Sequence, residues 1–260
     1  MTFPSPRGGG LRLPRPPFAA VLALAILAMA ALWAVAAPSS HAEDGNGSYA
    51  VSQGQALFQK GCASCHGLNS EGSPQGPSLI GVGAAAVDFQ VATGRMPLGR
   101  PGPEAERGKP KYNQTEIDQL SAYVASLAPG PERPVVDTSQ GNVVAGGQLF
   151  RLNCAQCHNA AGAGGALTYG KYAPELKPST AVQVVEAMRT GPENMPVFGP
   201  GQLNAQQATD IAAYVVTVTK SQDPGGHGIG RLGPVPEGIV IWTVGIGAVI
   251  AFTFWIGARS

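Results

Sequence analysis

The sequence predicts a mainly α-helical chain in which two small tandem domains lie between two apolar helices. Three observations lead to this prediction: a long segment occurs twice, both copies contain helix-like apolar spacing, and an uncharged apolar stretch lies toward each end of the chain. Glycine and proline, with 36 and 23 of the 260 residues, favour short helices joined by irregular, turn-rich segments. This composition disfavours a helical bundle or a regular sandwich.

The composition excludes several classes of function. Charged residues make up only 13% of the chain and hydrophobic residues 44%, which argues against a disordered tail protein. The formal net charge is +1, so no basic excess points to nucleic acid. The four cysteines form two Cys-x-x-Cys pairs and are not spread along the chain as a disulfide framework would be.

The first apolar stretch covers residues 18–37 and contains no charge. Three arginines and no acidic residue precede it, and residues 40–42 follow with the small-x-Ala pattern that signal peptidase cleaves. Two interpretations stay open, a cleaved signal peptide and an uncleaved membrane anchor. Residues 1–42 are therefore assigned as a basic N-terminus with a signal or anchor helix.

The second apolar stretch covers residues 238–258 and predicts a C-terminal transmembrane helix. Trp242 and Trp255 lie near its two ends, where interfacial anchors are expected. Basic residues favour the cytoplasmic side, so the N-terminal arginines and Arg259 place the C-terminus in the cytoplasm. The region between the apolar stretches is then expected on the extracytoplasmic side of the cell membrane.

That region contains an internal repeat. Residues 62–66 and 154–158 both read Cys-x-x-Cys-His, and a Leu-Phe pair precedes each motif at the same distance. The motifs Pro-x-Leu, Met-Pro and Ala-Tyr-Val then recur in the same order, at residues 77–79, 96–97 and 122–124 in the first copy and at 174–176, 195–196 and 213–215 in the second.

The repeat predicts two domains and two linkers. The domains are expected over residues 48–128 and 143–220. The linker at 129–142 has three prolines near its start and should hold a semi-rigid spacing. The linker at 221–237 mixes glycine with proline and leads to the second apolar stretch.

Each domain is expected to open with a helix that leads to its Cys pair and to close with an amphipathic helix. The closing helices have capping-box signals at their starts, Asn113 with Glu116 and Asn204 with Gln207. Four aromatic residues are expected in the cores, where the first and last helices of each domain cross: Phe58, Tyr123, Phe150 and Tyr214.

The Cys-x-x-Cys-His motifs indicate c-type haem. Two cysteines at this spacing can each form a thioether with a haem vinyl group, and the adjacent His supplies a nitrogen to the iron. A four-Cys zinc site would need the two pairs about 15–20 residues apart, and a thioredoxin-like pair does not explain the repeated His. We predict two covalently bound haem c groups, attached through Cys62, Cys65, Cys154 and Cys157 and ligated by His66 and His158.

Methionine is the expected second iron ligand in both domains. Met96 is the only Met between the two Cys motifs. The second domain offers Met188, within a helical pattern where a core Met is expected, and Met195, which precedes a proline and matches Met96 in the repeat. We predict Met96 for the first iron and Met195 for the second, which raises the reduction potential relative to two His ligands.

Two further expectations concern the loops. A carbonyl near Pro77 or Pro174 is expected to accept a hydrogen bond from the haem-ligating His of its domain. The mixed-charge stretch at residues 100–111 is expected to be a solvated loop, with partner docking as the alternative.

Together these motifs resemble class I cytochrome c over both predicted domains. The arrangement is similar to the diheme cytochrome c subunits of actinobacterial menaquinol–cytochrome c reductases (cytochrome bcc complexes), and residues 77–83, 191–196 and 255–260 strengthen the similarity. The resemblance implies a cytochrome b subunit, a Rieske iron–sulfur subunit and a haem–copper oxidase as partners. It also implies an electron relay that breaks no substrate bond, so no catalytic residue is assigned.

Haem domains by themselves indicate electron transfer and no more. Two electron-transfer alternatives therefore stay open: a subunit that serves a periplasmic dehydrogenase, and a subunit of another oxidase or reductase. Haem-based ligand sensing is disfavoured, because a Met ligand on each iron leaves no open coordination position.

Overall fold

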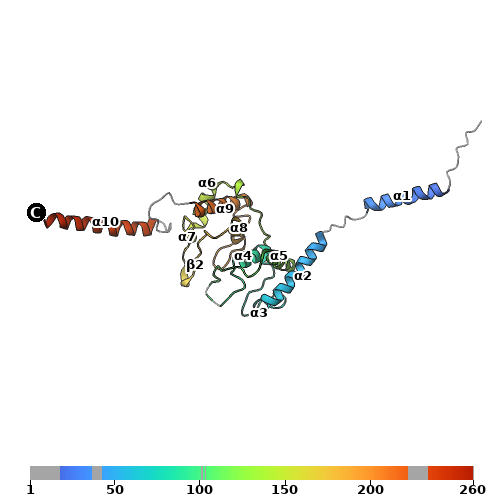
Figure 1. Ribbon diagram of the computed structural model, residues 1–260, viewed down its shortest axis with the longest axis horizontal. Helices are drawn as coiled ribbons and strands as arrows, with labels where there is room; N and C mark the ends of the chain where they lie inside the picture. The colour runs from blue at the N-terminus through green and yellow to red at the C-terminus, as the bar shows by residue number, and fades with distance from the viewer. Residues whose placement is uncertain (1–17, 37–42, 101, 103, 222–233, 260) are drawn as a thin grey trace, which may run out of the picture. The chain divides into compact units, whose positions relative to one another are not determined.

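The computed structural model describes residues 18–36, 43–100, 102, 104–221 and 234–259 (Figure 1). The chain forms two compact units, Met1–Asp44 and Gly45–Ser260. The first unit contains α1 (Phe18–Ala36), a helix without a charged residue. The arginines that precede it and the small-x-Ala pattern that follows it lie outside the described residues.

The first repeat is built from four helices that share one core. Buried residues from all four helices form this core: Phe58, Ala63, Val91, Ile117, Leu120, Tyr123 and Val124. The helices are α2 (Glu43–Gly61), α3 (Ala63–His66), α4 (Gly83–Ala92) and α5 (Gln114–Leu127).

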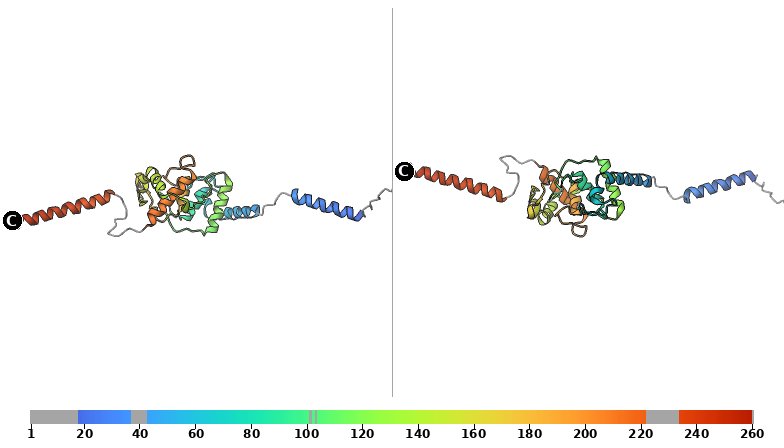
Figure 2. Two further views of the ribbon diagram at one scale, coloured as in Figure 1. Left: turned by 90° about the horizontal axis from the view of Figure 1, so that it is seen from above. Right: turned by 90° about the horizontal axis from the view of Figure 1, so that it is seen from below.

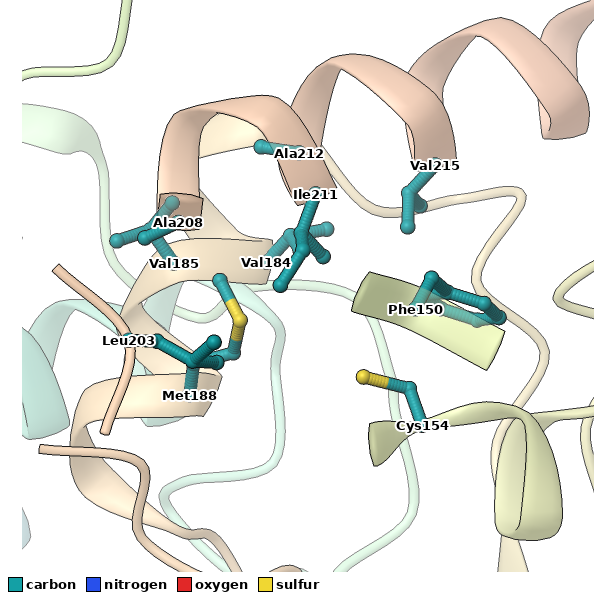
Figure 3. Close-up of a cluster of buried hydrophobic side chains, with 10 residues drawn as sticks. All are labelled: Phe150, Cys154, Val184, Val185, Met188, Leu203, Ala208, Ile211, Ala212 and Val215. Carbon is teal, nitrogen blue, oxygen red and sulfur yellow. The ribbon is translucent and has the colours of Figure 1, made fainter. Parts of the chain in front are cut away.

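The second repeat contains the same helix order with a small hairpin added. Its elements are η1 (Thr138–Gln140), α6 (Val143–Asn153), α7 (Ala155–His158), β1 (Gly165–Ala166), η2 (Thr168–Gly170), β2 (Tyr172–Ala173), α8 (Ala181–Thr190) and α9 (Ala205–Lys220). Its core, drawn in Figure 3, includes Phe150, Cys154, Met188 and Ile211. The mainly helical fold predicted from the sequence is confirmed.

The predicted capping boxes are present at the starts of α5 and α9. The Asn113 side chain accepts from the Glu116 amide at 3.1 Å, and the Glu116 carboxylate accepts from the Asn113 amide at 2.8 Å. Asn204 and Gln207 exchange the same two bonds. These side chains satisfy backbone N–H groups that have no partner inside the helix, so each helix begins at its cap.

The first and last helices of each repeat cross at a glycine. A Cβ on Gly54 of α2 would overlap the backbone of Gln119 on α5, and a Cβ on Gly146 of α6 would overlap the backbone of Asp210 on α9. Only glycine permits this close backbone approach.

An aromatic pair packs with tilted rings one helical turn beyond each glycine. The ring centroids lie 5.3 Å apart in both pairs, Phe58 with Tyr123 and Phe150 with Tyr214. The four rings are therefore core aromatics at the helix crossings, as the sequence predicts.

The two repeats pack against each other through α4 and α8, and Figure 2 shows the two groups of helices side by side. The segment that joins them lies against the first repeat. The Ala85 amide donates to the Pro131 carbonyl at 3.1 Å. Arg133 forms ion pairs with Asp88 on α4 and Asp118 on α5. These contacts fix the start of the linker to the first repeat.

The loop between α4 and α5 differs in part from the sequence expectation of a solvated segment. Arg107 donates to the Pro178 carbonyl at 3.0 Å and to Gln183 at 2.9 Å, both in the second repeat. The carboxylate of Glu104 accepts from the Tyr172 amide at 3.1 Å. The packing of α4 on α8 brings this loop over the second repeat, so Arg107 and Glu104 bind within the chain. The other charged residues of the stretch are exposed, as expected for a solvated loop: Arg100, Glu106, Lys109 and Lys111.

The C-terminal apolar stretch forms α10 (Pro234–Gly257). The helix starts before the predicted residue 238, because proline is well suited to a first helical position. Among the described residues, one helix, Val235–Gly257, is long and apolar enough to cross a membrane, and α1 contains a shorter apolar stretch, Phe18–Ala31. Residues 222–233 of the second linker lie outside the described residues.

Candidate functional site

The two Cys-x-x-Cys-His motifs adopt the same tight turn. The His66 amide donates to the Cys62 carbonyl at 3.0 Å, and the His158 amide donates to the Cys154 carbonyl at 2.9 Å. Each motif directly follows the first long helix of its repeat, α2 or α6. A single helical turn therefore carries both thiols and the imidazole, as attachment of one group at both sulfurs requires.

The first cysteine of each motif is the more buried of the two. Cys154 is buried and Cys62 half-buried, whereas Cys65 and Cys157 are exposed. Burial, together with the neighbouring Cys of the motif, raises the pKa of Cys62 and of Cys154 to about 11. Both thiols are therefore protonated at neutral pH.

Each motif His is held by a backbone carbonyl, as the sequence predicts. Nδ1 of His66 lies 2.7 Å from the Pro77 oxygen, and Nδ1 of His158 lies 3.1 Å from the Pro174 oxygen. A carbonyl oxygen only accepts, so Nδ1 carries the proton and Nε2 keeps a lone pair for a metal. Burial also lowers the pKa of His158, against the opposing effect of the Pro174 bond, and this favours the neutral ring.

A cavity of about 290 Å³ lies against the second motif. Cys154, Cys157, His158 and Met195 all line it, and apolar side chains such as Leu176, Val184 and Phe198 form much of the rest of the wall. Two thiols, an imidazole nitrogen and a thioether sulfur on one mainly apolar cavity fit a covalently attached haem. Figure 3 shows Cys154 among the core side chains of this repeat.

Both candidate methionines of the second repeat line this cavity. Met188 is 1% exposed and lies in the core on α8, which agrees with the core Met expected from the helical pattern. Met195 is half-buried in the loop after α8 and packs against the same core. The first repeat places Met96 at the matching position, packed against its own core.

The described residues hold no group of three or more His, Cys, Asp or Glu side chains that could bind a metal ion. The Tyr214 hydroxyl donates to the Ala160 carbonyl at 2.8 Å. This bond attaches the loop after the second Cys-x-x-Cys-His motif to α9.

Sequence reasoning missed one part of the cavity. Four residues of the first repeat reach it: Phe89, Arg95, Glu104 and Ala105. A lone arginine between Gly94 and Met96 is the one sequence signal that could have drawn attention to this contact. The direction of its side chain depends on how the two repeats pack.

Comparison with known proteins supports the cytochrome character of both repeats. Residues 51–128 match the family model described as cytochrome c. Residues 141–215 match the model described as cytochrome c oxidase, cbb3-type, subunit III. A cbb3-type cytochrome c oxidase subunit, FixP of Sinorhizobium medicae, is 29% identical over 121 residues, which cover 43% of this chain and 40% of that protein.

More extensive similarity is found to subunits of one respiratory complex. The cytochrome bc1 complex cytochrome c subunit of Mycobacterium bovis is 45% identical over 253 residues, which cover 92% of this chain and 90% of that protein. The subunit of the same name from Corynebacterium efficiens is 43% identical over 230 residues, with 81% and 77% covered.

The similarity to these subunits runs through both repeats and is not confined to a haem-binding motif. The two family models coincide with the two repeats of the fold. A mainly helical chain with two cytochrome c domains and an apolar C-terminal helix agrees with this relationship. The chain therefore belongs to the family of cytochrome c subunits of the cytochrome bc1 complex.

Proposed function

We propose that this chain is a membrane-anchored diheme cytochrome that relays electrons from a Rieske and cytochrome b quinol-oxidising core to a terminal haem–copper oxidase. The observation that carries the proposal is the cavity lined by Cys154, Cys157, His158 and Met195, in a fold that repeats the same motif. A haem bound there supplies one-electron iron chemistry. The cytochrome c character of the family supports the electron-transfer role.

The protein residues in this proposal hold, orient and tune the haems. Cys62 and Cys65 attach the first haem, and His66 and Met96 ligate its iron. In the second domain Cys154 and Cys157 attach the haem, and His158 and Met195 ligate the iron. The Pro77 and Pro174 carbonyls keep each imidazole in the tautomer that coordinates through Nε2. The haem domains correspond to residues 48–128 and 143–220.

The C-terminal helix α10 is proposed as the membrane anchor. Its apolar length supports this role, and Arg259, two residues beyond it, supports a cytoplasmic C-terminus by the preference of basic residues for that side. The haem domains then lie on the extracytoplasmic side, where quinol-derived electrons reach them. The enzyme as a whole would be a menaquinol–cytochrome c reductase, in which this chain breaks no substrate bond.

A fixed relay suits the packing better than a mobile shuttle. The two repeats contact each other through α4 and α8, and Arg107 bonds across from one repeat to the other. Arg133 holds the start of the linker against the first repeat. A pair of haems in such packed domains keeps a constant separation, which a direct relay of electrons requires.

The proposal is tested first by haem content. The full-length chain, matured with the cytochrome c assembly system, should give two c-type haems per polypeptide in a pyridine haemochrome assay. Replacing Cys154 and Cys157 together by Ser should leave one haem, and so should the matched change at Cys62 and Cys65. A single haem in the unmodified chain, or haem removed by acid–acetone, would contradict the proposal.

A second candidate function is a subunit of a cbb3-type oxidase. It is favoured by the match of residues 141–215 to a model of such a subunit. Purification of the native complex in mild detergent separates the two functions. Recovery of b-type haem with a Rieske EPR signal supports the quinol-oxidising complex, whereas recovery with a catalytic oxidase subunit and no Rieske signal supports the alternative.

A further inference from the structure

Arg95 belongs to the first repeat, but its side chain lines the cavity of the second. It directly precedes Met96, the proposed ligand of the first iron. The residue is only 8% exposed, and its guanidinium carbon lies 4.9 Å from the centre of the Phe89 ring. The segment 95–96 therefore contributes to both candidate haem sites.

The protein does not provide hydrogen-bond acceptors for all the donors of the Arg95 guanidinium. Its Nη1 atom is buried and has no hydrogen-bond partner. Leaving a buried polar group unpaired costs about 1–3 kcal/mol, and more for a charged group. A buried cation of this kind calls for an anion that reaches it from inside the cavity.

The carboxylates of Glu104 and Glu193 line the same cavity, and each accepts a hydrogen bond from a backbone amide. Glu104 accepts from the Tyr172 amide at 3.1 Å, and Glu193 accepts from the Ala105 amide at 3.1 Å. Nη1 of Arg95 has no hydrogen bond to either carboxylate, so this atom is left to pair with an anion in the cavity.

We propose that Arg95 binds a propionate carboxylate of the haem in the second domain, across the contact between the two repeats. The planar fork of a guanidinium matches a carboxylate with two parallel hydrogen bonds. One short segment would then hold the first haem through the Met96 sulfur and the second haem through Arg95. This inference rests on the proposed function, because it requires a haem in the second cavity.

The proposal has a consequence for redox tuning. A cation that balances a propionate favours the ferrous state of the nearby iron over the ferric state, so Arg95 raises the potential of the second haem. It also keeps the propionate ionised. Without Arg95, the propionate would take up a proton more readily, and the potential would vary more with pH.

The test is a redox titration of the full-length holoprotein, followed by EPR to separate the two low-spin haems. Met96→His changes the proposed ligation of the first haem only and so assigns the signals. Arg95→Gln should lower the potential of the second haem, leave that of the first nearly unchanged and increase the pH dependence of the second. Arg95→Lys, which keeps the charge without the fork, should restore most of the potential.

Two arginines serve as matched controls. Arg107→Gln removes a charge whose hydrogen bonds are already made to protein groups, and Arg100→Gln removes an exposed charge. Both should change the pH dependence of the second haem less than Arg95→Gln does. An unchanged second potential in Arg95→Gln, or an equal effect of Arg100→Gln, would overturn the proposal.

Pairing of Arg95 with a protein carboxylate is a distinct outcome. Glu193→Gln should raise the second potential whichever partner Arg95 has, because it removes a negative charge. The pH dependence separates the two partners: if Arg95 pairs with Glu193, no propionate depends on it, Arg95→Gln leaves the pH dependence of the second potential unchanged, and the inference is wrong. The haem count keeps the two proposals apart. If the wild-type chain lacks the second haem, the proposed function fails; with two haems and no Arg95 effect, only this inference fails.

Discussion

The side chain of Glu186 on α8 lies beside that of Asp88 on α4, in the contact between the two repeats. Glu186 is fully buried, and its carboxyl group is within hydrogen-bonding reach of the Asp88 carboxylate. Burial raises the pKa of Glu186 to about 9, and the nearby Asp88 adds to the rise, while Arg133 opposes it. Glu186 is therefore protonated at neutral pH, and the contact between the repeats depends on a proton.

The first prediction is that stability falls as the pH rises toward 9. The pKa of Glu186 is higher in the folded chain than its ordinary value of 4.5, so folding binds a proton. The stabilising effect is complete below pH 4.5 and is lost as the pH approaches 9. Glu186→Gln should be more stable than the wild type at pH 9 by roughly 1–3 kcal/mol and nearly equal to it at pH 4.5.

Chemical denaturation of the holoprotein at several pH values measures this difference. Glu175→Gln is the matched control, because Glu175 is exposed in the same repeat and its replacement should not change the pH profile. A Glu186→Gln variant whose stability follows the wild-type curve at every pH would contradict the prediction.

The second prediction concerns the helix crossing at Gly54. Gly54→Ala should destabilise the first repeat by about 1–3 kcal/mol, because the added methyl group overlaps the backbone of α5. Gly47→Ala on the same helix is the control, since nothing lies within 4 Å of that position. It should be neutral or stabilising by up to about 1 kcal/mol, as replacement of a helical glycine usually is. Thermal unfolding of both variants measures the two changes in stability. Equal changes in stability for Gly54→Ala and Gly47→Ala would count against a close helix crossing at Gly54.

The third prediction distinguishes the two sulfurs that line the second cavity. Met195→Leu should remove about half of the near-infrared charge-transfer absorption of the oxidised protein, because one of the two proposed His/Met irons loses its sulfur ligand. It should also open a site for carbon monoxide on the reduced protein. Met188→Leu is the matched control and should keep the band at a cost below about 1.5 kcal/mol in stability. Loss of the band in Met188→Leu would show that Met188 is the ligand.

The fourth prediction concerns the relay itself. If both haem domains are fixed within one complex, electron flow needs no diffusional encounter with a soluble cytochrome, and encounter is the step that salt screens. Turnover from quinol to oxygen in the purified complex, without added cytochrome c, should be nearly independent of ionic strength. An absolute need for an added soluble carrier would contradict a fixed relay.

Several features of this protein follow from local sequence alone. The Cys-x-x-Cys-His turns depend on residues within five positions of one another, and so do the capping boxes at Asn113 and Asn204. The apolar helix α10 follows from the composition of residues 238–258, because a long uncharged apolar stretch in lipid must satisfy its backbone hydrogen bonds internally, as a helix does. The core aromatics follow from the repeat, since equivalent helices bury equivalent faces. Short-range hydrogen bonds and side-chain periodicity suffice for all of these features.

The side-chain contacts between the two repeats could be determined only from the tertiary structure. Arg95 directly precedes Met96 in the sequence, but where α4 packs on α8 its side chain lines the cavity of the second repeat. The same packing buries Glu186 beside Asp88 and brings Arg107 onto Pro178. These pairs are far apart in the chain, and no local propensity encodes them. They arise because the two domains bury their facing helices against each other. A charged side chain in that contact therefore interacts with residues that are close in space but distant in the sequence.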